Sequence, residues 1–154
     1  MGFASVKISQ ALSGVKRLGI ETSPFIYLVE KNPAYLDRIQ AIFQYVSKGR
    51  IQGITSSITL AEVLTMPLKM KQQQYVDAYR RMLLNTDNIK TQPVTTAVAE
   101  RAAQLRASYG LRTPDALHIA TAIEYRCDAF LTNDLQLMRV SEIRVLVLDK
   151  LATD

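Results

Sequence analysis

The stretch from Leu111 to Asp134 constrains the fold of this chain more than any other, because it predicts a helix that leads into a buried strand. Thr113 is a suitable N-cap and Pro114 suits the first helical position. Apolar residues at helical spacing predict one broad buried face, made of Ala116, Leu117, Ala120, Ala122 and Ile123. Asp115 is therefore expected in the first turn of this helix.

A short apolar strand is expected directly after the helix. Residues 126–128 break the helical pattern, and residues 129–131 are apolar enough for a central strand. Residues 132–134, Thr-Asn-Asp, are typical of a turn. Asp134 is therefore expected at the carboxyl end of a buried strand, where it would be a second acid in the same region as Asp115.

The rest of the chain predicts further strands that alternate with helices. Strands are expected at 17–20, 51–55, 89–91 and 144–148. Helices are expected at 25–30, 34–48, from about Thr59 to an interruption at Met66-Pro67, at 71–84 and at 94–109. This order favours an α/β fold with a parallel sheet of four to five strands and helices on both faces. Residues 1–154 are expected to form one domain, with 1–16 as an N-terminal extension or short helix.

Composition narrows the class of protein. A chain of 154 residues suits one domain, and its single cysteine excludes an internal disulfide and a cysteine-rich zinc site. No run reaches the ~18 apolar residues of a membrane span and no apolar leader is present, so we expect a soluble cytoplasmic protein. The net charge of +5 suits a polyanionic partner such as RNA, although scattered basic residues also suit plain solubility.

Four acids are expected at one rim of the sheet, where the carboxyl ends of parallel strands form the usual ligand crevice. Glu21 and Asp134 follow strands directly, and Glu62 and Asp115 stand one helical turn further. Each acid separately has a structural explanation, such as a capping box of Thr59 with Glu62. Together they require a counterion, because carboxylates about 4 Å apart repel by roughly 4 kcal/mol at an effective dielectric near 20. Oxygen ligands of this kind suit Mg²⁺ or Mn²⁺.

The segments GIETSPFIYLVE, ITSSITLAEVL, LRTPDALHIATA and FLTND resemble, in matching order, the four acidic motifs of PIN-domain ribonucleases, especially the VapC-type toxins. The resemblance covers nearly the whole chain. It implies a PIN-like fold, RNA as the substrate and Mg²⁺- or Mn²⁺-dependent endonucleolytic cleavage with one or two ions. It also implies a cognate antitoxin as partner and leaves a homodimer open. The implied catalytic residues and metal ligands are Glu21, Glu62, Asp115 and Asp134. Glu21 departs from the family pattern, which usually has Asp there.

Polar neighbours of these acids are candidates for supporting roles. Thr22, Thr132 and Asn133 could orient the ligands or donate to a phosphate, with local turn and cap bonding as the alternative. Arg112 is a candidate contact for an RNA phosphate. The same is expected of Lys69, Lys71, Arg80 and Arg81, for which solvated helix charges are the alternative.

His118, the only histidine, stands one turn after Asp115. General-base chemistry and metal ligation are conceivable for it, but a histidine beside Ala and Ile on a helix is more often a packed, hydrogen-bonded core residue.

Two other functions compete with the ribonuclease. A receiver-like phosphorylation switch also gathers acids around Mg²⁺. It requires paired acids after the first strand and a lysine at the end of the last strand, whereas here Glu21 stands alone and Lys150 lies beyond Asp149. A non-catalytic RNA- or protein-binding PIN-like module with a degenerate acidic site is the second alternative, because the usual first Asp is missing.

Overall fold

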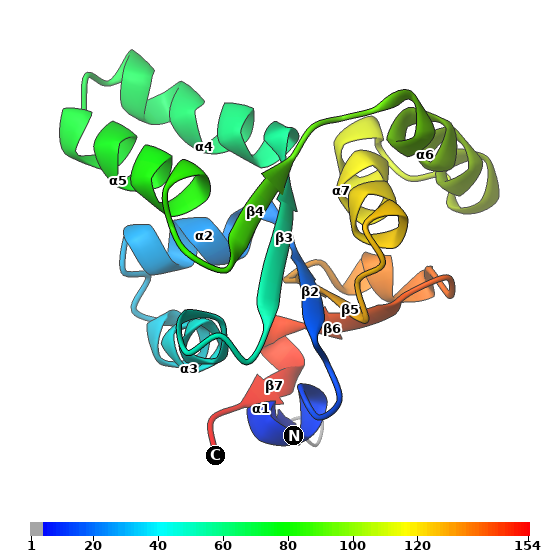
Figure 1. The fold of residues 1–154 in the computed structure, drawn as a ribbon, viewed down its shortest axis with the longest axis horizontal. Helices are drawn as coiled ribbons and strands as arrows, with labels where there is room; N and C mark the ends of the chain where they lie inside the picture. Colours follow the sequence, from blue (N-terminus) through cyan, green and yellow to red (C-terminus); the bar gives the residue numbers. More distant parts are fainter. Residues whose placement is uncertain (1–4) are drawn as a thin grey trace.

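A parallel sheet of five strands forms the centre of the computed structural model, which describes residues 5–154 (Figure 1). Its strands are β2 (Arg17–Ile20), β3 (Gln52–Ser56), β4 (Ile89–Gln92), β5 (Ala129–Thr132) and β6 (Arg144–Val147). Their spatial order is β4-β3-β2-β5-β6. A second, two-stranded parallel sheet pairs β1 (Val6–Lys7) with β7 (Leu151–Ala152). The expected α/β fold with a parallel sheet is confirmed.

Helices cover both faces of the sheet (Figure 1). One face carries α1 (Ile8–Ala11), α2 (Thr22–Val29), α3 (Leu36–Ser47), α4 (Ser57–Lys69) and α5 (Gln73–Leu84). The other carries α6 (Thr96–Tyr109) and α7 (Thr113–Glu124). Two 3₁₀ turns, η1 (Leu135–Arg139) and η2 (Leu148–Lys150), flank β6. No helix of residues 5–154 has the length and apolarity that a membrane crossing requires.

The sheet separates two apolar cores, because successive side chains of a strand point to opposite faces. In β5, Ala129 and Leu131 pack into the core under α2 to α5, and Phe130 packs into the core under α6 and α7. In β2, Gly19 faces α7, and a Cβ atom built there would lie 2.6 Å from the Cβ of Ala122. The absence of a side chain at Gly19 therefore lets α7 pack closely against the sheet.

The strand order reverses between β2 and β5. From β2 the chain proceeds outward through β3 to β4, and it then returns past them to place β5 on the other side of β2. This is a topological switch point, outside which ligands bind in open α/β sheets. Glu21 follows β2 and Asp134 follows the end of β5 by two residues, so both acids lie at the switch point.

The helix expected near the N-terminus is wrong for most of its length. Residues 6–7 form β1, because β7 from the far end of the chain offers them a strand to pair with. The helix that follows is only the four residues of α1, whose Ile8 and Ala11 are buried. The expectation for residues 1–4 lies outside the described residues.

Four expected helix boundaries are also wrong. Pro67 does not interrupt α4 but lies buried within it, two residues before its end. Ser56 caps α4 by accepting from the Ile58 N–H at 3.1 Å, so there is no capping box of Thr59 with Glu62. Thr113 is the first residue of α7 rather than its N-cap. The helix expected from residue 25 begins at Thr22. The residues at which a helix begins and ends depend on which backbone groups the neighbouring elements cover, and the periodicity of the sequence does not show this.

Candidate functional site

Thr132 links the two acids at the switch point. The backbone N–H of Glu21 donates to the carbonyl of Leu131 at 3.0 Å, which joins the exit of β2 to β5. The Thr132 hydroxyl donates to the carboxylate of Glu21, and its oxygen accepts from the backbone N–H of Asp134 at 3.0 Å. The carboxylate of Asp134 also accepts from the N–H of Gln136 at 2.9 Å and so caps η1. One side chain therefore holds both acidic residues in register.

Glu21 is buried, with 9% of its surface exposed. Burial raises its pKa, and the nearby charges of Asp115 and Asp134 raise it further, against the hydrogen bond from Thr132 and the charge of His118. The carboxylates of Asp115 and Asp134 therefore lie close enough to Glu21 to disfavour its charge. A cation among them would relieve this repulsion.

Asp115 lies in the first turn of α7 and is 8% exposed. Arg112, which precedes the helix, donates from Nε to Oδ2 of Asp115 at 3.2 Å, and its own side chain is 79% exposed. The hydrogen bond and charge of Asp115, with the charges of Asp134 and Glu21, raise the pKa of Arg112. Arg112 thus brings a solvent-facing guanidinium to the edge of the acidic site.

Glu62 reaches the same region from α4, but its partners differ from those of the other acids. Its Oε1 accepts from the Thr22 hydroxyl at 2.6 Å and lies 2.7 Å from Nε2 of His118. The hydrogen bond of His118 and that of Thr22 lower the pKa of Glu62 against the effect of burial. Glu62 is therefore an ionised carboxylate held by two side chains that adjoin the site, since Thr22 follows Glu21 and His118 lies on α7 with Asp115.

The donor set fits a hard divalent cation in type and in electrostatics. Its carboxylate oxygens suit Mg²⁺ or Mn²⁺, and the buried Glu21 carboxylate gains most from a nearby positive charge. In the part of the chain that the structure describes, no three His, Cys, Asp or Glu side chains are grouped tightly enough to hold an ion as they stand. Binding would therefore require the carboxylates to turn toward one another.

The supporting residues that the sequence indicated have different surroundings. Thr22 contacts Glu62, and Thr132 contacts Glu21. Asn133 instead donates from Nδ2 to the Tyr27 hydroxyl at 3.3 Å and accepts the backbone N–H of Asp149 at 3.1 Å. Its side chain thus connects the turn after β5 to α2 and to η2.

Sequence reasoning missed the contact between His118 and Glu62. Residues three apart on a helix share a face, so the spacing of Asp115 and His118 was the available signal. The partner on α4 was not visible in that spacing. The basic residues Lys69, Lys71, Arg80 and Arg81 are all exposed. Lys69 ends α4, Lys71 lies in the turn between α4 and α5, and Arg80 and Arg81 lie on α5.

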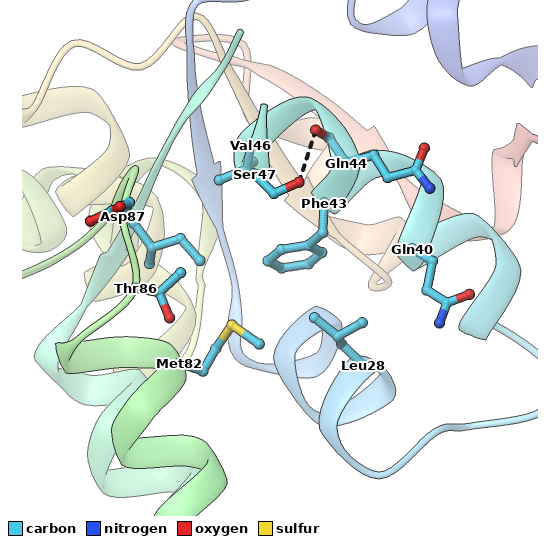
Figure 2. A pocket seen from close by; sticks show the side chains of 10 residues that line it. Leu28, Gln40, Phe43, Gln44, Val46, Ser47, Met82, Thr86 and Asp87 are labelled. Carbon is cyan, nitrogen blue, oxygen red and sulfur yellow. Dashed lines mark hydrogen bonds between the residues drawn. The ribbon is translucent and has the colours of Figure 1, made fainter. Parts of the chain in front are cut away.

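A groove between α2, α3 and α5 has a volume of about 410 Å³. Figure 2 shows Leu28, Phe43 and Met82 converging in it. Polar side chains such as Gln40 and Asp87 also line it. None of the four candidate acids contributes to this groove, so it is separate from the acidic site.

Comparisons with known proteins agree with this architecture. The model of the PIN domain family matches residues 20–143. VapBC2 from Rickettsia felis, solved with a promoter DNA fragment, has a TM-score of 0.69 at 17% identity and covers 85% of this chain and 98% of its own. A toxin–antitoxin complex from Klebsiella pneumoniae has a TM-score of 0.64 at 28% identity and covers 86% and 98%. FitAcB from Neisseria gonorrhoeae has a TM-score of 0.62 at 20% identity and covers 86% and 97%. No curated protein sequence matches the chain.

Proposed function

The chain belongs to the PIN domain family, and from this premise we propose that it is a metal-dependent endoribonuclease, the toxin of a toxin–antitoxin pair. One observation carries the proposal. Glu21 is buried at the switch point of the sheet, and burial and the charges of Asp115 and Asp134 raise its pKa. Folding retains a buried carboxylate beside two other acids at the place where α/β sheets bind ligands, and a cation offsets that cost.

The proposed ligands of Mg²⁺ or Mn²⁺ are Glu21, Glu62, Asp115 and Asp134. When bound, such an ion activates water and neutralises the charge that develops on a phosphodiester. Thr132 orients the carboxylate of Glu21 and the backbone of Asp134. Arg112 is exposed beside Asp115, so its guanidinium can donate to a phosphate oxygen at the rim of the site.

RNA is the proposed substrate because the chain as a whole is basic and Arg112 is exposed beside Asp115. The chain carries a net charge of +5 although several of its acids are gathered at the switch point. The proposed contacts for the RNA backbone are the exposed Lys69 at the end of α4, Lys71 in the turn after it, and Arg80 and Arg81 on α5. Binding of this kind weakens as the salt concentration rises.

A cognate antitoxin protein is the proposed partner. The support is that the similar structures from Rickettsia felis and Klebsiella pneumoniae were both solved as toxin–antitoxin assemblies. Co-expression with the product of the neighbouring reading frame, followed by co-purification, tests this part of the proposal.

The test of the activity is cleavage of single-stranded and structured RNA by the purified protein with Mg²⁺, with Mn²⁺ and with EDTA. We expect cleavage with either metal, none with EDTA, and a loss of at least about 100-fold in Glu21→Gln and Asp134→Asn. Glu100→Gln, which removes an exposed acid of α6, is the matched control and should cleave normally. If the wild-type protein binds RNA but leaves it intact with both metals, the chain is a non-catalytic binding module and not a nuclease.

A further inference from the structure

His118 is a buried histidine with one engaged nitrogen and one isolated nitrogen. The residue is 4% exposed. Its Nε2 lies 2.7 Å from Oε1 of Glu62 and 3.3 Å from the Thr22 hydroxyl oxygen. Its Nδ1 is buried without a hydrogen-bond partner. The ring thus connects α7 to α4 and α2 through Nε2 alone.

We propose that His118 is a positioning residue of the acidic site, whose Nε2–H, together with the Thr22 hydroxyl, fixes the carboxylate of Glu62. This inference rests on the proposed function, because it assigns His118 an effect on the reaction that passes entirely through a candidate metal ligand. It differs from both roles that the sequence suggested for a reactive histidine, general base and metal ligand.

The geometry excludes those two roles. A general base or a metal ligand must present a nitrogen lone pair to the reacting proton or to the ion. Nε2 is directed at Glu62 and donates its hydrogen there. Nδ1 is sealed from solvent among the packed residues of α7, so neither water nor substrate reaches it. Neither nitrogen of His118 is available to the reaction.

Glu62 needs such an anchor because its side chain is otherwise mobile. It projects from α4 with 39% of its side chain exposed, and a glutamate in that position has several accessible rotamers. Both hydrogen bonds end on Oε1, which leaves Oε2 as the oxygen that remains for a cation. The two donors therefore orient the carboxylate through one oxygen and leave the other oxygen for a cation.

Buried threonine hydroxyls in turn support the Thr22 hydroxyl. The Thr22 hydroxyl oxygen lies 3.2 Å from that of Thr59, which is fully buried. Thr59 in turn lies 2.9 Å from the Thr55 hydroxyl, and Thr55 donates to the carbonyl of Ile20 at 2.8 Å. This chain of hydroxyl groups connects Glu62 to the last residue of β2, immediately before Glu21.

The experiment compares His118→Leu, which removes the donor at similar volume, with His118→Gln, which keeps an N–H at comparable reach. Mn²⁺ binding is measured by titration calorimetry and RNA cleavage by kcat. We expect His118→Leu to weaken Mn²⁺ binding and kcat by about 10- to 100-fold, the usual loss when the support of a metal ligand is removed. His118→Gln should recover most of the loss, which a role in packing alone would not predict.

Coupling to Glu62 is the decisive readout. If His118 acts only through Glu62, the double variant His118→Leu/Glu62→Gln should be no worse than Glu62→Gln alone. Losses that multiply would overturn the inference, because they would give His118 a role of its own. Should His118→Leu fail to fold, Thr22→Val removes the other donor of the same anchor, and unchanged Mn²⁺ binding in it would equally overturn the inference.

The proposed function and this inference fail in different ways. Wild-type protein that neither binds Mn²⁺ nor cleaves RNA would overturn the proposed function. Mn²⁺ binding and RNA cleavage that survive His118→Leu unchanged would overturn the positioning role alone.

Discussion

Replacing Gly19 with alanine should push α7 away from the sheet. The new Cβ would lie 2.6 Å from the Cβ of Ala122 and 3.0 Å from a ring carbon of Phe130. Carbon atoms in contact ordinarily lie about 3.5–4.0 Å apart, so a gap of roughly 1 Å must open. The Cβ of Ala122 is fixed to the helix backbone and no side-chain rotation can move it. The helix itself therefore has to shift.

The loss of stability in Gly19→Ala follows from the geometry of this contact. Overpacking of a core costs about 1–3 kcal/mol, which for a chain of this size lowers the melting temperature by roughly 2–12 °C. The shift also affects the acidic site, because α7 carries Asp115 and β2 leads into Glu21. A displacement of about 1 Å in such a site lowers catalysis by about 100-fold.

Thermal melts in EDTA and RNA cleavage assays measure both effects, with Gly53→Ala as the matched control. In β3 the tightest contact of the same substitution is with the terminal methyl group of Ile20, at 3.1 Å, which can rotate away. Adding Ala122→Gly to Gly19→Ala removes the contact with the helix and should restore cleavage, with about 1 kcal/mol lost to a glycine inside a helix. If Gly19→Ala melts and cleaves as Gly53→Ala does, the close packing of α7 on β2 does not set the geometry of the site.

Three further predictions concern single side chains. Glu21→Gln should raise the melting temperature in EDTA at pH 7, because burial raises the pKa of Glu21 and the fold therefore disfavours its charge, whereas glutamine still accepts from Thr132. The difference in melting temperature between Glu21→Gln and wild type should be small below the unfolded pKa of about 4.3 and should widen as the pH rises toward the pKa of Glu21 in the folded protein. A difference that calorimetry finds to be independent of pH would contradict this reasoning. Mg²⁺ at 100 times its dissociation constant should stabilise wild type by about 2.7 kcal/mol and Asp115→Asn much less, and equal gains in thermal melts would remove Asp115 from the ligand set. Burial raises the pKa of Cys127 to about 12, so at pH 8 the native thiol should react with a disulfide reagent far more slowly than it does in urea, and equally rapid reaction would show that the site is open.

The parts of the fold that the sequence predicted correctly are those set by short-range pattern. The apolar run 129–131, followed by turn residues, indicated β5, and Gly110 marked the end of α6, where it adopts the left-handed conformation at φ 66°. Strands that alternate with helices indicated a parallel sheet. Because parallel strands end at one edge, the approach of Glu21 to Asp134 followed from their positions alone.

The parts that the sequence did not predict depend on partners distant in the chain. Strand β1 exists because β7, more than 140 residues away, pairs with it. Pro67 stays within α4 because the helix is packed at that point and the residue is buried. Periodicity reports which face of an element is apolar but not which neighbour covers that face.

The same division applies to the acidic site. The sequence by itself determined the identities of its acids and the sheet edge at which they gather, because both follow from residue type and local pattern. Only the tertiary structure decided that Thr132 bridges Glu21 and Asp134, and that Glu62 is held by Thr22 and His118. Hydrogen bonds between elements depend on angles and separations of about an ångström, which arise from the packing of α4 and α7 against the sheet and are not encoded in the spacing of any one segment.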